Sequence, residues 1–413
     1  MKQLRIGIFG GGRGTSFAEG FLLCNHRVVA LCERNEKTAA EFREKFGKDL
    51  AIYEDFDKFL NHGLDAVVLC NFFNEHAKYA IRCLERGIHV LSECTAAGTM
   101  AEAVALVRAA EKSKAIYMLA ENYPFMLMNT EMKRVCDGGT LGKFLYAEGE
   151  YNHPFQPSEV ADYRPFAKHW RNYLPRTYYI THSLAPLMYM TGATPRRVAG
   201  LPVYAPFAPT DPVPSPVADR AAIITTLNDD DSVFRVTGCA GFGAHGNSYR
   251  ICGTKGQIEN LRGMKNKISL RYNAWDIPED REAVNLYDAE WHDSDEELIR
   301  KTGHGGGDFI VCRTFLECLR EGKKPPFDVY FATTLSSVAI LSHRSILQGG
   351  IPYDVPDFHD EEARRQYEND TATPFWGENG EEPTIPACSH PDYAPTPEML
   401  AGYEALVEAK RNS

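Results

Sequence analysis

The chain lacks several features that would place it in other classes of protein. Its 413 residues contain no apolar run of the roughly 18 residues that a membrane-spanning helix needs. They also contain no run of Lys and Arg long enough to bind a nucleic acid or a lipid surface, and the formal net charge is -11. There is no internal repeat and no low-complexity segment. We therefore expect neither a membrane nor a nucleic acid as a partner.

Cysteine pairs and a leader segment are missing as well. The eleven cysteines form no Cys-x-x-Cys pair, and several of them lie in apolar runs. This pattern predicts buried free thiols in a reducing compartment, and we expect no metal site. The N-terminal sequence MKQLRIGIFG enters a strand directly and leaves no room for a signal peptide. The expected location is therefore the cytoplasm.

The first part of the chain alternates short apolar strands with helices. The expected strands are residues 6–9, 26–32, 51–53, 64–70, 88–91 and 116–120. This rhythm is typical of a parallel, doubly wound sheet, so we predict an α/β Rossmann domain over residues 1–123. Ligands of such sheets bind outside the carboxyl ends of the strands.

A glycine cluster follows the first strand. Gly10 permits a tight turn, Gly12 lets the backbone approach a phosphate, and a helix is expected from Thr15 or Ser16 onward. The third glycine of the G-x-G-x-x-G pattern is replaced by Thr15, with Gly14 just before it. Strand, glycine turn and helix predict a dinucleotide pyrophosphate site that includes Arg13.

Polar residues also follow the later strands. Glu33 lies roughly 20 residues after the glycine loop, where an acidic side chain bonds the adenosine ribose. A carboxylate there favours NAD over NADP, and the neighbouring Arg34 weakens that preference. The other strand ends carry Asn71, His76, Glu93, Glu121 and Asn122. Because parallel strands end at one edge of a sheet, we expect these residues to converge.

The pattern changes after Pro124. Alternating strands are expected at residues 144–151, 220–227, 233–239, 249–253, 257–261 and 267–272. They predict an α+β domain over residues 124–355 with a large, mostly antiparallel open sheet. Such a sheet often pairs face to face, which predicts a homo-oligomer, a dimer or tetramer. Residues 279–297 are typical of an exposed charged loop. Residues 356–413 are expected to form a C-terminal strap over the protein's own surface or over a partner subunit.

Two segments of the second part concentrate polar aromatic residues and histidine. Residues 166–197 include Trp170, Arg171, Tyr179 and His182, the last just before a helix expected over residues 183–190. The alternative interpretation is a core helix with amphipathic aromatic residues. His304 stands beside three glycines, and Asp308 is expected to cap the helix that follows.

The order of these motifs resembles the Gfo/Idh/MocA family of NAD(P)-dependent oxidoreductases over residues 1–355. In that family a T-P-N-x-x-H segment and an E-K-P segment help to bind the dinucleotide. Here they read Asn71-Phe72-Phe73-Asn74-Glu75-His76 and Glu93-Cys94-Thr95. Cys94 therefore replaces the family lysine that handles the proton of the substrate hydroxyl.

A narrower resemblance is to the NAD-dependent retaining glycosidases of this superfamily, the α-N-acetylgalactosaminidase type, which also lack the lysine. Their motifs correspond to Glu121-Asn122-Tyr123, Gly149-Glu150-Tyr151, Tyr179-Ile180-Thr181-His182 and His304-Gly305-Gly306-Gly307-Asp308. Ile180 departs from the family's Y-P-T-H, and the segment after Asn122 differs too. For this reason the family's substrate specificity is not carried over.

The resemblance implies a carbohydrate or glycoside substrate and roles for individual residues. Tyr179 and His182 would handle the proton of the oxidised hydroxyl, and Tyr151 or Glu121 would take the proton of the adjacent carbon. His304 would bind the sugar or assist the leaving group, while Trp170 and Arg171 would border the nicotinamide. Three hypotheses stay open: a redox-neutral glycosidase, a net sugar dehydrogenase, and a non-catalytic NAD-binding sensor.

Overall fold

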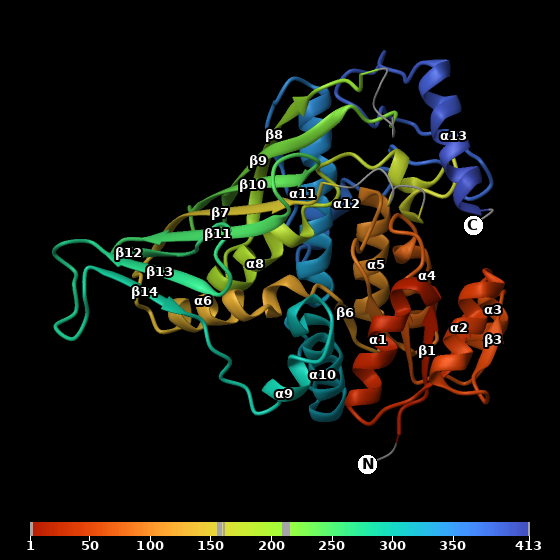
Figure 1. Ribbon diagram of the computed structural model, residues 1–413, viewed down its shortest axis with the longest axis horizontal. Coiled ribbons are helices and arrows are strands. Elements are labelled where there is room, and N and C mark those ends of the chain that lie inside the picture. Colours follow the sequence, from red (N-terminus) through yellow and green to blue (C-terminus); the bar gives the residue numbers. More distant parts are fainter. Residues whose placement is uncertain (1–2, 155–158, 160–161, 209–214, 412–413) are drawn as a thin grey trace.

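A computed structural model describes residues 3–154, 159, 162–208 and 215–411. It contains two sheets joined by helices (Figure 1). The first sheet has six parallel strands in the order β3-β2-β1-β4-β5-β6. Its strands are β1 (Ile6–Phe9), β2 (Val28–Cys32), β3 (Ala51–Tyr53), β4 (Ala66–Leu69), β5 (His89–Ser92) and β6 (Tyr117–Leu119). The predicted Rossmann sheet is therefore confirmed.

The strand order reverses at β1, which pairs with β2 on one side and β4 on the other. A ligand crevice lies at such a point, outside the carboxyl ends of the strands. The helices that connect these strands are α1 (Gly11–Leu23), α2 (Glu36–Phe46), α3 (Phe56–Leu60), α4 (His76–Glu85) and α5 (Met100–Lys112). The sequence thus places its strand-end polar residues at this crevice.

The first helix begins at Gly11, four residues earlier than the predicted Thr15. Gly10 precedes it with φ 93, and a Cβ at Gly10 would meet the Cys70 carbonyl oxygen at 2.4 Å. Gly14 lies inside the helix, where a Cβ would stand 2.4 Å from a methyl of Ile8. The glycines therefore bring the helix close onto β1 and the neighbouring chain.

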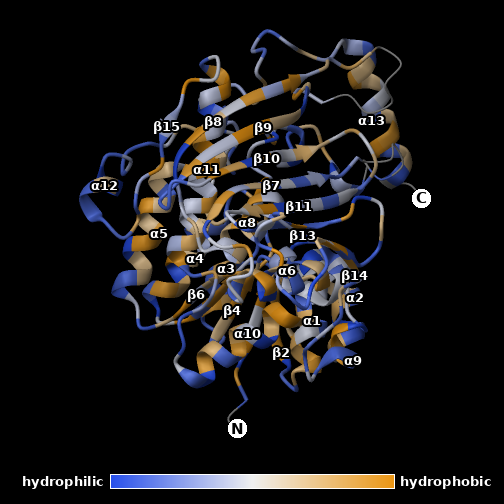
Figure 2. Ribbon diagram, turned by 90° about the vertical axis from the view of Figure 1, so that its left-hand side faces the viewer, coloured by the Kyte–Doolittle hydropathy of each residue, from blue (hydrophilic) through white to orange (hydrophobic). Residues whose placement is uncertain are grey.

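The second sheet has nine strands in the order β14-β13-β12-β11-β7-β10-β9-β8-β15. Only β10 and β7 pair in parallel, so the mostly antiparallel sheet is confirmed. Its strands are β7 (Phe144–Asn152), β8 (Pro195–Tyr204), β9 (Asp219–Asn228), β10 (Val233–Ala240), β11 (Gly246–Gly253), β12 (Gly256–Asn260), β13 (Lys267–Tyr272), β14 (Val284–Asp288) and β15 (Tyr353–Asp354). Their alternating hydropathy shows as alternating colours along the strands (Figure 2).

Two expectations about this second part were wrong, and one strand was not predicted. Residues 279–297 are not simply an exposed loop, because they contain β14, which pairs with β13, and the start of α9 (Glu296–Ile299). β8 was not predicted, because its sequence does not alternate cleanly. Asp308 does not cap a helix: α10 (Gly307–Glu321) starts after Gly306, and the Asp308 side chain bonds elsewhere.

Helices cover one face of the large sheet and connect it to the first domain. They are α6 (Leu127–Asp137), α8 (Thr181–Thr191) and α11 (Val329–Leu347). Gly149 of β7 permits close contact, since a Cβ there would lie 2.0 Å from the Ser183 carbonyl oxygen of α8. Helix α8 starts at Thr181 rather than Ser183, so His182 belongs to its first turn.

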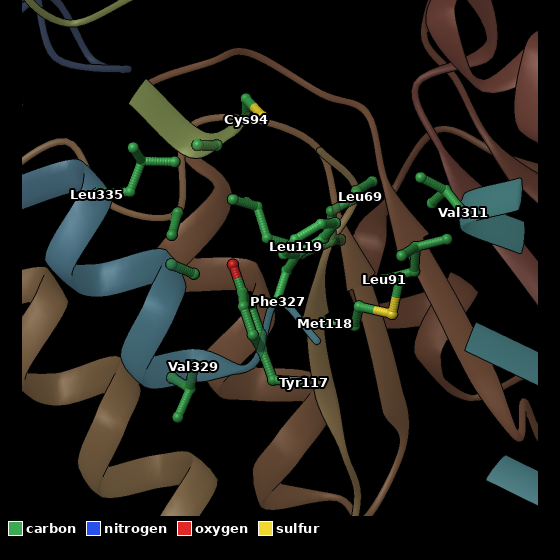
Figure 3. Close-up of a cluster of buried hydrophobic side chains, with 14 of the residues drawn as sticks. Leu69, Leu91, Cys94, Tyr117, Met118, Leu119, Val311, Phe327, Val329 and Leu335 are labelled. Atoms are coloured by element: carbon green, nitrogen blue, oxygen red, sulfur yellow. The ribbon is translucent and has the colours of Figure 1, made fainter. Parts of the chain in front are cut away.

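A buried cluster joins the two parts. Leu69, Leu91 and Leu119 of the parallel sheet pack with residues at the start of the α11 segment, including Phe327 and Val329 (Figure 3). Cys94 lies at one end of this cluster. The core therefore continues from one sheet to the other and fixes the crevice between them.

The C-terminal strap packs against other parts of its own chain. It contains α12 (Glu361–Arg365) and α13 (Pro397–Arg411), and α13 lies at the upper right in Figure 1. Arg364 bonds Glu111 of α5, and Tyr403 bonds the Arg164 carbonyl oxygen. In the part of the chain that the structure describes, no helix has the length and apolar character needed to cross a membrane.

Candidate active site

A cavity of about 840 Å³ opens at the carboxyl ends of the parallel strands, facing the second domain. The first domain contributes its glycine turn, the ends of β2, β4, β5 and β6, and part of the segment before α4. The second domain contributes aromatic residues and histidines: Tyr151, His153, Tyr163, His169, Trp170, Tyr179, His182, His245 and His304. Of the described residues that line the cavity, none is a lysine.

A buried carboxylate stands behind one of these histidines. His182 Nδ1 lies 2.7 Å from Oε1 of Glu121, which is fully buried just after β6. An ionised carboxylate only accepts hydrogen bonds, so Nδ1 carries a proton, and in the neutral imidazole Nε2 is then the acceptor nitrogen. The His182 ring stacks on Tyr123 with centroids 3.9 Å apart, and its carbonyl accepts from the Tyr249 hydroxyl. The imidazole is thereby held in one orientation.

The surroundings of Glu121 keep it ionised. Burial alone raises its pKa, but His182, the Cys94 thiol and the Tyr123 amide outweigh burial and hold the pKa below its usual value. The Cys94 Sγ donates to Glu121 Oε2 over 3.0 Å. Burial and the carboxylates of Glu121 and Glu93 raise the pKa of Cys94 well above its ordinary value. Cys94 is thus a neutral donor to Glu121.

Glu121 itself does not line the cavity. Its oxygens contact His182, the Cys94 thiol and the Tyr123 amide. This placement disfavours the hypothesis that Glu121 takes a proton directly from the substrate, and its role stays a prediction.

Two tyrosines stand on the cavity side of His182. The Tyr179 ring lies 5.1 Å from the His182 ring, and the Tyr151 ring lies 5.0 Å from it. Burial raises the pKa of Tyr151, and neighbouring Tyr179 and Tyr123 add to the effect. Burial also raises the pKa of Tyr179, and the nearby Arg171 only partly offsets this rise. Both phenols are therefore protonated and serve as hydrogen-bond donors.

A second ionic cluster lies beside the glycine turn. Asp308 receives two bonds of 2.7 Å from the Arg13 guanidinium, a bond from the Asn122 amide, and a contact of 2.8 Å with His304 Nδ1. Burial opposes ionisation, but Arg13 and His304 lower the pKa of Asp308. Arg13 also bonds Glu93 at 2.6 Å. The cluster ties the first helix to α10 across the two domains.

The glycine turn and the neighbouring strand ends fit a dinucleotide. No atom lies within 4 Å of a Cβ built at Gly12, which lines the cavity, and α1 begins beside it. Within the described chain, both amide atoms of Asn71 are buried without a hydrogen-bond partner. Glu33 lines the cavity and accepts from the amides of Gly11 and Asn35. The phosphate side offers helix N–H groups, and the ribose side offers a carboxylate.

Some residues that are predicted to bind the cofactor make contacts within the protein. Gly14 and Thr15 lie outside the cavity wall: Gly14 packs on Ile8, and the Thr15 hydroxyl bonds the Gly11 carbonyl oxygen. His76 lines the cavity, yet Nδ1 contacts the Thr95 carbonyl and Nε2 the Asn71 carbonyl, and burial lowers its pKa. His76 therefore holds the loop that presents Asn71.

Aromatic rings stack on each other along one border of the cavity. Phe73 and Trp170 lie parallel with centroids 5.0 Å apart, and the Arg171 guanidinium lies 4.3 Å from the Trp170 ring centre. Trp170 and Arg171 both line the cavity, where they were predicted to border the nicotinamide. That role stays a prediction.

Sequence reasoning missed several residues of the site. Asp308 was read as a helix cap, and Tyr123, His153, His245 and Glu378 were assigned no role. The H-G-G-x-D segment was a usable signal for Asp308. Glu378 lies in the strap, far from every motif. Among the described residues, no three His, Cys, Asp or Glu side chains gather to hold a metal ion.

Comparison with known proteins places this architecture in a family. Residues 4–121 match the oxidoreductase family with an NAD-binding Rossmann fold (GFO_IDH_MocA), and residues 243–364 match the glycosyl hydrolase 109 C-terminal domain. The first part of the chain therefore matches the Gfo/Idh/MocA oxidoreductases, and the second part matches their NAD-dependent glycosidase branch. The chain is an NAD-dependent enzyme of carbohydrates.

Individual relatives agree with this family. A glycosyl hydrolase family 109 protein from Streptomyces niveus is 27% identical over 386 residues, which cover 86% of this chain and 78% of the relative. Glycosyl hydrolase family 109 protein 2 from Phocaeicola vulgatus is 25% identical over 406 residues, covering 86% and 94%.

Solved structures share the fold at lower identity. Levoglucosan dehydrogenase in complex with NADH and L-sorbose superposes with a TM-score of 0.70 at 17% identity, covering 86% of this chain and all of that one. An oxidoreductase from Agrobacterium radiobacter in complex with NAD⁺, L-tartaric acid and magnesium gives 0.68 at 15% identity, covering 86% and 99%. These likenesses establish the fold alone.

Proposed function

We propose that the chain is a redox-neutral glycoside hydrolase that uses NAD as a recycled cofactor. The observation that carries this proposal is the Glu121–His182 pair beside a cavity without a described lysine, with Cys94 in the place of the family lysine. NAD, when bound, would supply the hydride acceptor and donor for a ring carbon of the substrate. Gly12, Glu33, Asn71 and Asn122 would hold the dinucleotide.

His182 is the base for the substrate hydroxyl. Its Nε2 accepts the hydroxyl proton while Glu121, ionised behind it, stabilises the imidazolium that forms. Tyr179 and Tyr151 keep their protons and donate hydrogen bonds to the oxygen as it becomes a carbonyl. This replaces the prediction that Tyr151 is a base, because a buried phenol ionises poorly.

The ketone so formed acidifies the hydrogen on the next carbon, and a second base must take it. We assign this to His153, whose ring lies 5.7 Å from that of Tyr151. Burial and His245 lower the pKa of His153, so it is a neutral imidazole at pH 7. A neutral imidazole accepts a proton far more readily than a buried phenol.

Loss of that hydrogen breaks the bond to the glycosidic oxygen, and we assign His304 the proton that the leaving oxygen takes up. His304 lines the cavity, and its Nδ1 contact with Asp308 orients the ring. Water is then added back at the carbon that lost the leaving group. The net change is hydrolysis with no consumption of cofactor.

The experiment compares free sugars and aryl glycosides as substrates in the presence of NAD⁺. We expect release of the aglycone without accumulation of NADH, and entry of solvent deuterium at the carbon next to the oxidised one. Stoichiometric NADH from free sugars would instead make the chain a net dehydrogenase. Tight NAD⁺ binding with neither reaction would make it a sensor.

Three expectations from the sequence stay proposals. They are the domain boundaries after residues 123 and 355, the homo-oligomer through the open face of the large sheet, and the cytoplasmic location. Sedimentation at several protein concentrations tests the second.

A further inference from the structure

The C-terminal strap places one carboxylate in the cofactor cavity. Residues 377–381 form a tight turn in which the Gly377 amide donates to the Glu381 carbonyl oxygen. Before the turn, Phe375 is buried against Tyr178 with ring centroids 5.3 Å apart. Lys168 Nζ lies 3.7 Å from the Trp376 ring centre. The turn is thus anchored on the second domain, and Glu378 lines the cavity.

Glu378 meets the two cations at the adenosine end of that cavity. Its Oε2 lies 2.7 Å from Lys78 Nζ, and its Oε1 lies 3.8 Å from a guanidinium nitrogen of Arg34. Lys78 also contacts Glu75 at 3.5 Å. Glu378 therefore lies between Arg34 and Lys78, and Glu33, Glu75 and Glu378 all line the cavity.

The Arg34 side chain suits NADP better than NAD. In Rossmann sites an acidic residue at the end of the second strand bonds the ribose 2′-hydroxyl, and a nearby arginine accommodates a 2′-phosphate. Glu33 and Arg34 stand next to each other at that position. The Glu33 carboxylate favours NAD and the Arg34 guanidinium favours NADP, so these two residues alone do not decide between the two cofactors.

We propose that Glu378 is a specificity-determining residue that makes the site reject a 2′-phosphorylated dinucleotide. It engages Arg34 and Lys78, which would otherwise attract the phosphate, and it adds a like charge where the phosphate would lie. NAD carries no 2′-phosphate and escapes this repulsion. The inference concerns the cofactor end of the cavity and is independent of the hydrolysis proposed above.

The test measures NAD⁺ and NADP⁺ binding to the full chain by titration calorimetry, so no turnover is needed. In Glu378→Gln we expect NADP⁺ to bind about fivefold more tightly, the effect of one exposed charge near a phosphate, with NAD⁺ affinity changed by less than about twofold. The gain should shrink at high salt, where exposed charges are screened. Glu382→Gln is the matched control, because Glu382 is exposed in the same segment and does not line the cavity.

A double-substitution cycle identifies the partner. In an Arg34→Ala background, Glu378→Gln should give less of the NADP⁺ gain, because the freed guanidinium is absent. Unchanged NADP⁺ affinity in Glu378→Gln overturns the proposal. Equal changes in the affinities for NAD⁺ and NADP⁺ also overturn it. They would show that the strap affects dinucleotide binding without distinguishing the two cofactors. Thermal unfolding of each variant establishes folding, and Glu378→Ala repeats the measurement with a second side chain.

Discussion

His182 Nδ1 lies 2.7 Å from Oε1 of Glu121, so the first turn of α8 is bonded to the chain just after β6. This contact crosses from the second domain to the first. A buried carboxylate thereby fixes the position of the proton on the imidazole that we propose as the base.

Replacing that carboxylate should impair turnover more than binding. In Glu121→Gln the imidazole loses its charged partner, so we expect kcat to fall by about 10²- to 10⁴-fold, the usual size of a general acid–base contribution. NAD⁺ affinity, measured by calorimetry, should hardly change. Glu362→Gln, at a side chain that is 79% exposed, is the control. Unaltered kcat in Glu121→Gln would remove the pair from the mechanism.

Tyr179 and its neighbour Tyr178 offer a matched pair. Tyr179 lines the cavity, whereas the Tyr178 hydroxyl lies 3.4 Å from the Gly98 carbonyl oxygen, away from the cavity. Tyr179→Phe should abolish turnover while NAD⁺ remains bound. Tyr178→Phe should keep activity and cost about 1 kcal/mol of unfolding free energy from one lost hydrogen bond. Rates with an aryl glycoside and urea unfolding measure both; activity in Tyr179→Phe contradicts the assignment.

Two glycines of the loop should differ in their contributions, one to cofactor binding and the other to packing. A Cβ at Gly12 meets no atom within 4 Å, so Gly12→Ala should fold normally but bind NAD⁺ more weakly, because the methyl projects where the phosphate approaches. A Cβ at Gly14 would stand 2.4 Å from Ile8 Cγ2, so Gly14→Ala should lose about 1–3 kcal/mol of unfolding free energy by overpacking. Denaturant unfolding and calorimetry distinguish them. The opposite pattern would reverse these roles.

Asp308 links pH to stability. Its folded pKa lies below the unfolded value of about 4, so its stabilisation is complete above that value and is lost as pH falls through the folded pKa. Asp308→Asn should cost about 3–5 kcal/mol at pH 7, since a buried ion pair loses one partner. The difference from the native chain should narrow in urea unfolding below about pH 4.

The control for this measurement is Asp392→Asn, at an exposed position of the strap. It should leave unfolding unchanged at both pH values. A deficit in Asp308→Asn that stays constant as pH falls would show that the loss comes from packing rather than charge.

Much of the fold follows from local sequence. The six apolar strands, their rhythm with helices and the glycine turn predict a doubly wound parallel sheet, because strand burial and right-handed crossovers leave few arrangements. The strand-end positions of Glu33, Asn71 and Glu93 follow from the same pattern. β14 was missed because its charged flanks conceal a strand that pairs with β13.

The roles of the site residues required the tertiary structure. The sequence determined which chemical groups exist: the glycine turn, the cysteine in place of a lysine, and the Tyr-x-Thr-His and His-Gly-Gly-x-Asp segments. Only packing decided that Glu121 lies behind His182, that Asp308 binds Arg13 instead of capping its helix, and that Glu378 reaches Arg34. These contacts join residues 61, 295 and 344 positions apart. Local sequence preferences cannot encode them, because the segments that carry each pair come together only when the whole chain is folded.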